Sequence, residues 1–138
     1  GLNRLGLNQH IAERLDPKQY PCAPGQGALA VVLRSADAET CRLVKMLDHP
    51  ETRVASLAER TVLASLGGGC RLPLGAFAEI TGELLVVYAV LYGETSENTV
   101  HVVETGSVSD PVGTGKRAAD KILLQCDDVR LNEIQKGF

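Results

Sequence analysis

The hydrophobic and polar positions of this chain follow two spacings, one typical of helices and one typical of strands. Apolar residues recur at helical spacing over residues 7–15, and Asp16-Pro17 ends that pattern. A loop rich in proline and glycine follows. Residues 28–33 then form a compact apolar run, which predicts a buried strand.

Two helices are predicted next, in a part of the chain that we expect to form a separate domain from Ser35 onward. Apolar residues at helical spacing cover residues 37–47 and again residues 50–66. Pro50 suits the first turn of the second helix, and Gly67 suits its C-terminal cap.

Three strands and a last helix complete the pattern. Residues 74–81 alternate in polarity, and a Gly82-Glu83 turn joins them to a second strand over residues 84–92. A third strand is predicted over residues 99–108, and helical spacing returns after Asp110-Pro111. Helices and strands that do not alternate strictly predict an α+β domain, here a three-stranded antiparallel sheet packed against helices.

Composition and charge argue against several classes of function. The 138 residues are 44% hydrophobic and 22% charged, which is enough for one or two small globular domains. Trp is absent and the formal net charge is −3, so neither an aromatic platform nor a basic surface for nucleic acid is predicted. No apolar stretch approaches the roughly 20 residues that a membrane-spanning helix needs.

The cysteines and the N-terminus bear on the compartment and on the extent of the chain. The four cysteines are scattered without a Cys-x-x-Cys pair, so we expect no metal site. Their low density and the absence of a signal peptide favour a reducing, cytoplasmic compartment over disulfides. The first residue is not Met and lies inside an apolar pattern, so we expect a fragment or a processed chain.

Cys70 is the position with the most informative chemistry. It follows three glycines, whose backbone can adopt positive φ and come close to a bulky group. A free cysteine is most often a small buried hydrophobe, but a core position does not need such a flexible approach. None of the three histidines stands in a recognisable motif with Cys70, so a protease-type nucleophile is not favoured. Permanent covalent attachment of an electrophilic carbon remains.

The Gly25-Gln26-Gly27 motif is a second candidate site. Glycines on both sides of an amide indicate backbone close to a ligand, because the Gln26 side chain has both a donor and an acceptor. A plain loop before the predicted strand explains the same residues equally well, and the sequence leaves both interpretations open.

Three charged motifs are less specific. Glu59-Arg60 falls in the middle of a predicted helix, where a solvated face is favoured over a ligand site. Arg71 stands beside Cys70 and either binds a carboxylate of an attached group or faces solvent. Residues 113–116 contain Gly-Lys but lack the spacing of a phosphate-binding loop, so we expect a helix start there.

Four motifs together resemble the porphobilinogen deaminase family, whose members are also called hydroxymethylbilane synthases. They are Pro-Gly-Gln-Gly-Ala-Leu at residues 24–29, Asp-His-Pro-Glu-Thr at 48–52, Ala-Glu-Arg at 58–60, and Leu-Gly-Gly-Gly-Cys-Arg-Leu-Pro-Leu-Gly at 66–75. Their order and spacing cover nearly the whole chain. Two positions depart from the usual pattern: Gly67 replaces a common Glu, and Pro24 replaces a frequent Val.

The resemblance implies a three-domain enzyme with two domains like periplasmic binding proteins and a third, small α+β domain. Residues 1–34 then correspond to a helix at the end of the second domain and a strand that returns to the first. Residues 35–138 correspond to the C-terminal domain. By the same resemblance, Cys70 carries a dipyrromethane cofactor through a thioether, and Gln26 with the Gly27 backbone lies near that cofactor.

The function implied is that of a transferase in tetrapyrrole, and hence porphyrin and heme, biosynthesis. The complete enzyme deaminates porphobilinogen and polymerises it on the cysteine-linked primer into hydroxymethylbilane. The family's catalytic Asp and its substrate-binding Arg residues lie in segments that this chain lacks, so we expect no catalytic residue here and no activity of this chain alone. The implied partners are porphobilinogen and the remaining enzyme domains, and the family suggests a monomer. Two alternatives stay open: a non-catalytic α+β ligand-binding module, and a redox sensor that uses a reactive Cys70 thiol.

Overall fold

The computed structural model describes residues 1–67, 72–93 and 98–126, and the predicted site residues Cys70 and Arg71 lie outside them. In chain order the elements are η1 (Asn8–His10), α1 (Ala38–Val44), η2 (Lys45–Leu47), α2 (Pro50–Leu66), β1 (Leu74–Thr81), β2 (Leu84–Leu91), β3 (Val100–Ser107) and α3 (Pro111–Gln125), where η denotes a 3-10 helix.

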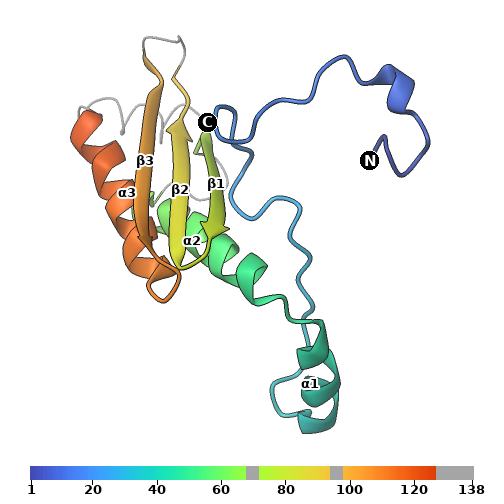
Figure 1. Ribbon diagram of the computed structural model, residues 1–138. Coiled ribbons are helices and arrows are strands. Elements are labelled where there is room, and N and C mark those ends of the chain that lie inside the picture. The colour runs from blue at the N-terminus through green and yellow to red at the C-terminus, as the bar shows by residue number, and fades with distance from the viewer. Residues whose placement is uncertain (68–71, 94–97, 127–138) are drawn as a thin grey trace.

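The strands form one antiparallel sheet in the order β1-β2-β3, and α2 and α3 cover one of its faces (Figure 1). Ala76 of β1 pairs with Ala89 of β2, which pairs with Val102 of β3, so these three side chains point to the same face. Gly82, with φ +63°, lies in the two-residue turn that joins β1 to β2. The predicted α+β class and the antiparallel hairpin are therefore confirmed.

The hydrophobic core lies between the sheet and the two helices. Its fully buried members come from the central strand and from the facing sides of α2 and α3: Leu85, Val87, Ala89, Ala58, Val62, Ala118, Ala119 and Ile122. The helices approach closely because Gly115 of α3 has no side chain. A Cβ there would lie 2.5 Å from the Ala58 carbonyl oxygen and 2.8 Å from the Thr61 Cβ of α2.

Local capping explains where the two long helices begin and end. The His49 ring accepts the Thr52 N–H before α2, and Pro50 occupies the first turn. Gly67 caps the other end of α2 with φ +70°. Asp110 accepts the Gly113 N–H at 2.9 Å at the start of α3. The helix starts predicted at Pro50 and after Asp110 are thus confirmed.

The N-terminal part of the chain differs from the prediction. The expected helix over residues 7–15 is reduced to η1, and the expected strand over residues 28–33 does not form. Leu29 and Val32 are 98% and 93% exposed. A strand needs another strand for its backbone hydrogen bonds, and the described residues place none beside this run. An apolar sequence alone therefore does not produce a strand here.

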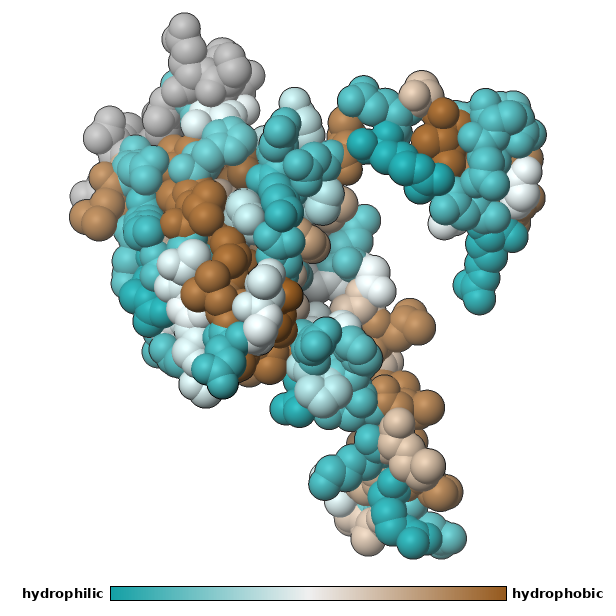
Figure 2. Space-filling model, viewed as in Figure 1, coloured by the Kyte–Doolittle hydropathy of each residue, from teal (hydrophilic) through white to brown (hydrophobic). Residues whose placement is uncertain are grey.

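The segment formed by α1 and η2 lies apart from the sheet and its helices (Figure 1). Apolar side chains lie on the surface of this segment and on the uncovered face of the sheet (Figure 2); among the most exposed are Leu43, Met46, Leu47 and Val103. The division of the chain after residue 34 stays a prediction. In the described parts of the chain, no helix has the length and the apolar character that crossing a bilayer requires.

Candidate functional site

The Pro-Gly-Gln-Gly segment forms two successive reverse turns, called here the double turn. The Gln26 N–H donates to the Ala23 carbonyl at 3.0 Å, and the Ala28 N–H donates to the Gly25 carbonyl at 3.2 Å. Gly25 and Gly27 occupy the third position of their turns, with φ of +75° and +89°. Glycine adopts this conformation without the steric strain that a side chain would add.

Glu59 of α2 holds the double turn against the sheet. Its carboxylate accepts the Gly25 N–H at 2.7 Å and the N–H of Ala78, on the outer edge of β1, at 2.8 Å. The residue is only 8% exposed. Burial raises the pKa of the Glu59 carboxyl, and the two N–H donors partly oppose that rise. The prediction of a solvated Glu59 is therefore wrong, because its side chain bonds two backbone segments that are far apart in sequence.

The backbone just before the double turn covers the rest of the same strand edge. The Cys22 carbonyl accepts the Ala76 N–H at 2.8 Å, and the Pro21 carbonyl accepts the Tyr92 hydroxyl at 3.2 Å. A Cβ at Gly75 would overlap the Pro21 carbonyl oxygen, so this approach needs glycine. Two N–H groups on the outer edge of β1, those of Ala76 and Ala78, are thus bonded to a peptide carbonyl and to a carboxylate, which opposes pairing with another strand there.

The double turn presents hydrogen-bonding groups to solvent. Gln26 and Gly27 are exposed, and a Cβ at Gly27 would meet no atom within 4 Å. Within residues 1–67, 72–93 and 98–126, no partner is found for the Gly27 N–H or for the Gln26 amide. The stem of the exposed Arg60 lies beside Gly25. A donor set of this kind suits an anion such as a carboxylate.

The structure describes the flanks of the Gly-Cys motif rather than Cys70 itself. Gly67 ends α2, and the buried Leu72 leads into β1. The start of β1 is also where the segment before the double turn contacts the sheet, through Cys22 and Ala76. The roles of Cys70 and Arg71 stay predictions.

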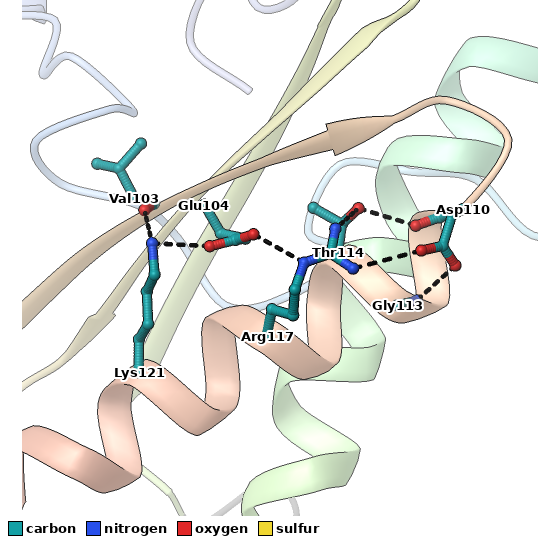
Figure 3. Close-up of polar contacts among 7 residues, drawn as sticks. All are labelled: Val103, Glu104, Asp110, Gly113, Thr114, Arg117 and Lys121. Carbon is teal, nitrogen blue, oxygen red and sulfur yellow. Dashed lines mark hydrogen bonds and ion pairs between the residues drawn. The ribbon is translucent and has the colours of Figure 1, made fainter.

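A second buried carboxylate, which the sequence interpretation did not single out, lies between β3 and α3 (Figure 3). Glu104 accepts from Arg117 Nε at 2.8 Å and from Lys121 Nζ at 2.7 Å. Burial opposes its ionisation, but the bonds from these two cations hold the pKa of Glu104 below its usual value. The same Arg117 donates to Thr114 and to Asp110. The sequence did contain a clue, since Glu104 lies two and four residues after Val102 and Val100, on the same face of the strand, and the two cations stand four residues apart.

Two other features do not contribute to the predicted site. A shallow pocket of about 390 Å³ lies on the uncovered sheet face, and none of the predicted site residues lines it; its wall includes Lys18, Tyr20, Tyr88 and His101. Among the described residues, no group of His, Cys, Asp and Glu side chains is arranged to hold a metal ion. Residues 113–116 lie in α3, as expected.

Comparison with known proteins gives two family matches. The model of "Porphobilinogen deaminase, C-terminal domain" matches residues 54–124. The model of "Porphobilinogen deaminase, dipyromethane cofactor binding domain" matches residues 1–42. The double turn falls in the second match, and Glu59 and Cys70 fall in the first.

Curated relatives carry the same name. A porphobilinogen deaminase of Roseiflexus castenholzii is 43% identical over 123 residues, which are 89% of this chain and 40% of that protein. Enzymes of that name from a Nostoc species and from Coxiella burnetii are each 38% identical, over 99% of this chain and 44% of their own length. The chain therefore spans less than half the length of these relatives.

Proposed function

Because this chain belongs to the porphobilinogen deaminase family, we propose that it supplies the part of such an enzyme that carries the dipyrromethane cofactor. In this proposal the complete protein is a transferase of tetrapyrrole biosynthesis, which deaminates porphobilinogen and joins the units into hydroxymethylbilane. Cys70 holds the cofactor through a thioether, and Gln26 and Gly27 bind it without a covalent bond.

The set of donors on the double turn is the observation that carries this proposal. Gln26 and Gly27 are exposed, and no partner for the Gln26 amide or the Gly27 N–H is found among the residues described. A dipyrromethane built from porphobilinogen bears carboxylate side chains, and these donors match such groups. The family model named for cofactor binding covers the same residues. When bound, the dipyrromethane supplies the pyrrole carbon to which substrate units are joined.

The surroundings of Cys70 in the chain suit an anchor. Cys70 stands three residues after Gly67, which ends α2, and two residues before Leu72, which is buried in the core. The attachment point is thus close in sequence to fixed structure on both sides. A carbon–sulfur thioether does not exchange with other thiols as a disulfide does, so a primer bound in this way stays on the protein through turnover.

The two buried carboxylates among the described residues bind and orient other groups and are not arranged to transfer protons. The buried carboxylate of Glu59 is occupied by two backbone N–H groups, and that of Glu104 by two cations. Neither is available as a general acid or base. We therefore propose that deamination is carried out by parts of the enzyme beyond this chain, and that this chain alone does not turn over porphobilinogen.

Intact-mass measurement of the complete enzyme tests the attachment. We expect one dipyrromethane adduct per protein, a red-violet colour in acidic aldehyde reagent, and loss of both in Cys70→Ser. The exposed thiol of Cys22 offers a matched control, so Cys22→Ser should keep the adduct. An adduct that maps to Cys22, or an active enzyme without an adduct, would contradict the proposal.

A further inference from the structure

The two buried carboxylates of this protein have different partners. Glu59 and Glu104 are each 8% exposed. Glu104 is paired with two cations, whereas the hydrogen bonds found for Glu59 among the described residues come from two backbone N–H groups. Burying a carboxylate without a cation is costly, so this arrangement is not explained by ion-pair stability. It has to be explained by what the two bonds hold in place.

The bond from Gly25 to Glu59 is the side-chain contact that holds the double turn itself, beyond the contacts of Pro21 and Cys22 just before it. Gly25 donates its N–H to Glu59, and its carbonyl accepts the Ala28 N–H that closes the second turn. Gln26 and Gly27 lie between these two contacts. Any displacement of Gly25 from Glu59 therefore moves the Gln26 amide and the Gly27 N–H.

The other bond ties the same carboxylate to the part of the chain that contains Cys70. Ala78 is the fifth residue of β1, and β1 begins four residues after Cys70. Glu59 itself belongs to α2, which ends at the residues leading to Cys70. One side chain thus connects the double turn with both elements that flank the predicted anchor.

We infer that Glu59 is a positioning residue. It holds the Gln26 and Gly27 donors of the double turn at a constant distance from α2 and β1, the two elements on either side of Cys70 in the sequence. The inference rests on the proposed function, because it is the cofactor that contacts both places. Glu59 does not touch the reacting atoms. It maintains the geometry in which a primer anchored at one place is recognised at the other.

The Glu59→Gln variant of the complete enzyme tests this role. The amide keeps the size of the side chain but offers only one acceptor, so one backbone N–H loses its bond. We expect kcat per cofactor-loaded enzyme to fall about tenfold, the scale of one lost charged hydrogen bond, because the displaced group is the primer. The KM for porphobilinogen should change less than about twofold. A variant that was merely less stable would instead yield less folded, cofactor-loaded enzyme, and the kcat of that enzyme would be unchanged. Glu51→Gln, an exposed change on the same helix, is the matched control and should leave both constants unchanged.

Hydrogen exchange provides a readout that does not depend on activity. In the wild-type enzyme the Gly25 and Ala78 amides should exchange at least about 100-fold more slowly than in an unstructured peptide. In Glu59→Gln at least one of them should exchange about tenfold faster, while the cofactor content measured by mass stays the same. Because the wild-type measurement needs no variant, it tests the contact even if Glu59→Gln does not fold.

The two proposals fail in different ways. Rapid exchange of Gly25 in the wild type, or unchanged exchange and unchanged kcat in a folded Glu59→Gln enzyme that carries its cofactor, would overturn the role of Glu59. Absence of dipyrromethane from Cys70 in the wild type would overturn the proposed function. The hydrogen-exchange result would still show whether Glu59 holds the double turn.

Discussion

Substitutions in the Glu104 cluster should be strongly asymmetric in their effect on stability. Glu104 is buried, whereas the side chains of Arg117 and Lys121 are 47% and 49% exposed. When the carboxylate is removed, both cations can still reach water. When both cations are removed, the carboxylate stays under α3 with no counter-charge. The larger loss should therefore come from the double change Arg117→Met and Lys121→Met.

The expected sizes follow from the burial of each group. Removing the partners of a buried charge costs about 3–5 kcal/mol, and the slight exposure of Glu104 favours the lower end, about 3 kcal/mol. Methionine keeps the apolar stems of the two long side chains, so little packing is lost with the charge. In Glu104→Leu, the new side chain lies beside the buried Val87 of the neighbouring strand, on the same face of the sheet. We expect the free energy of unfolding to change by less than about 1 kcal/mol. Combining all three changes should recover most of the loss.

Urea denaturation of the chain, followed by far-ultraviolet circular dichroism at pH 7, measures these differences. The free energy of unfolding should fall by about 3 kcal/mol in the double variant, with an unchanged denaturant slope. Lys116→Met on the exposed side of α3 is the control and should stay within about 0.5 kcal/mol of the wild type. If Glu104→Leu cost as much as the double variant, attraction between the charges would outweigh desolvation and the reasoning would be wrong.

Three further predictions concern pH, helix packing and activity. The pKa of Glu104 is lowered from the ordinary value of 4.5, so its contribution to stability is present above pH 4.5 and is lost as pH falls through the lowered pKa. The pKa of Glu59 is raised from the same value, so its contribution is present below pH 4.5 and is lost as pH rises through the raised pKa. We expect urea denaturation at a series of pH values from 3 to 8 to give the free energy of unfolding as a function of pH. The slope of this free energy against pH should change in opposite directions in Glu104→Gln and Glu59→Gln, and a change of the same sign in both would contradict these assignments. Gly115→Ala should cost about 1–3 kcal/mol, because its Cβ would press on α2, and a melting temperature equal to that of the wild type would show that the helices can separate freely. The isolated chain should release no ammonia from porphobilinogen, whereas measurable turnover would show that it contains a complete catalytic site.

Local sequence was sufficient for the elements whose ends are defined by their own residues. The helix α2 begins at Pro50, a first-turn proline, and ends at Gly67, a left-handed cap. Gly82 lies in the turn between β1 and β2. Such signals act within a few residues and do not depend on the rest of the fold. Residues 28–33 are the counterexample, since their composition predicts a strand but the backbone bonds of a strand require a neighbour.

The candidate site was predictable in part. The glycines beside Gln26 indicated either a loop open to a ligand or a plain loop, and the structure explains them as the third positions of two turns. The sequence predicts a solvated Glu59, because a position on a helix gives no information about the strand edge that the side chain faces. Only the packing of α2 against β1 shows that this edge offers the Ala78 N–H, which the sheet itself does not use.

The amino-acid sequence by itself determined the order of the elements, the α+β class and the motifs shared with the porphobilinogen deaminase family. These depend on residue spacing and on short-range conformational preferences. The tertiary structure alone decided that Glu59 bonds the double turn to β1 and that Glu104 is neutralised by α3. Both depend on which side chain reaches which unsatisfied polar group after the helices have packed on the sheet. The Gly25–Glu59 bond joins residues that are 34 positions apart in sequence, and the Glu104–Arg117 bond joins residues that are 13 positions apart. Both separations are beyond the range of any local pattern.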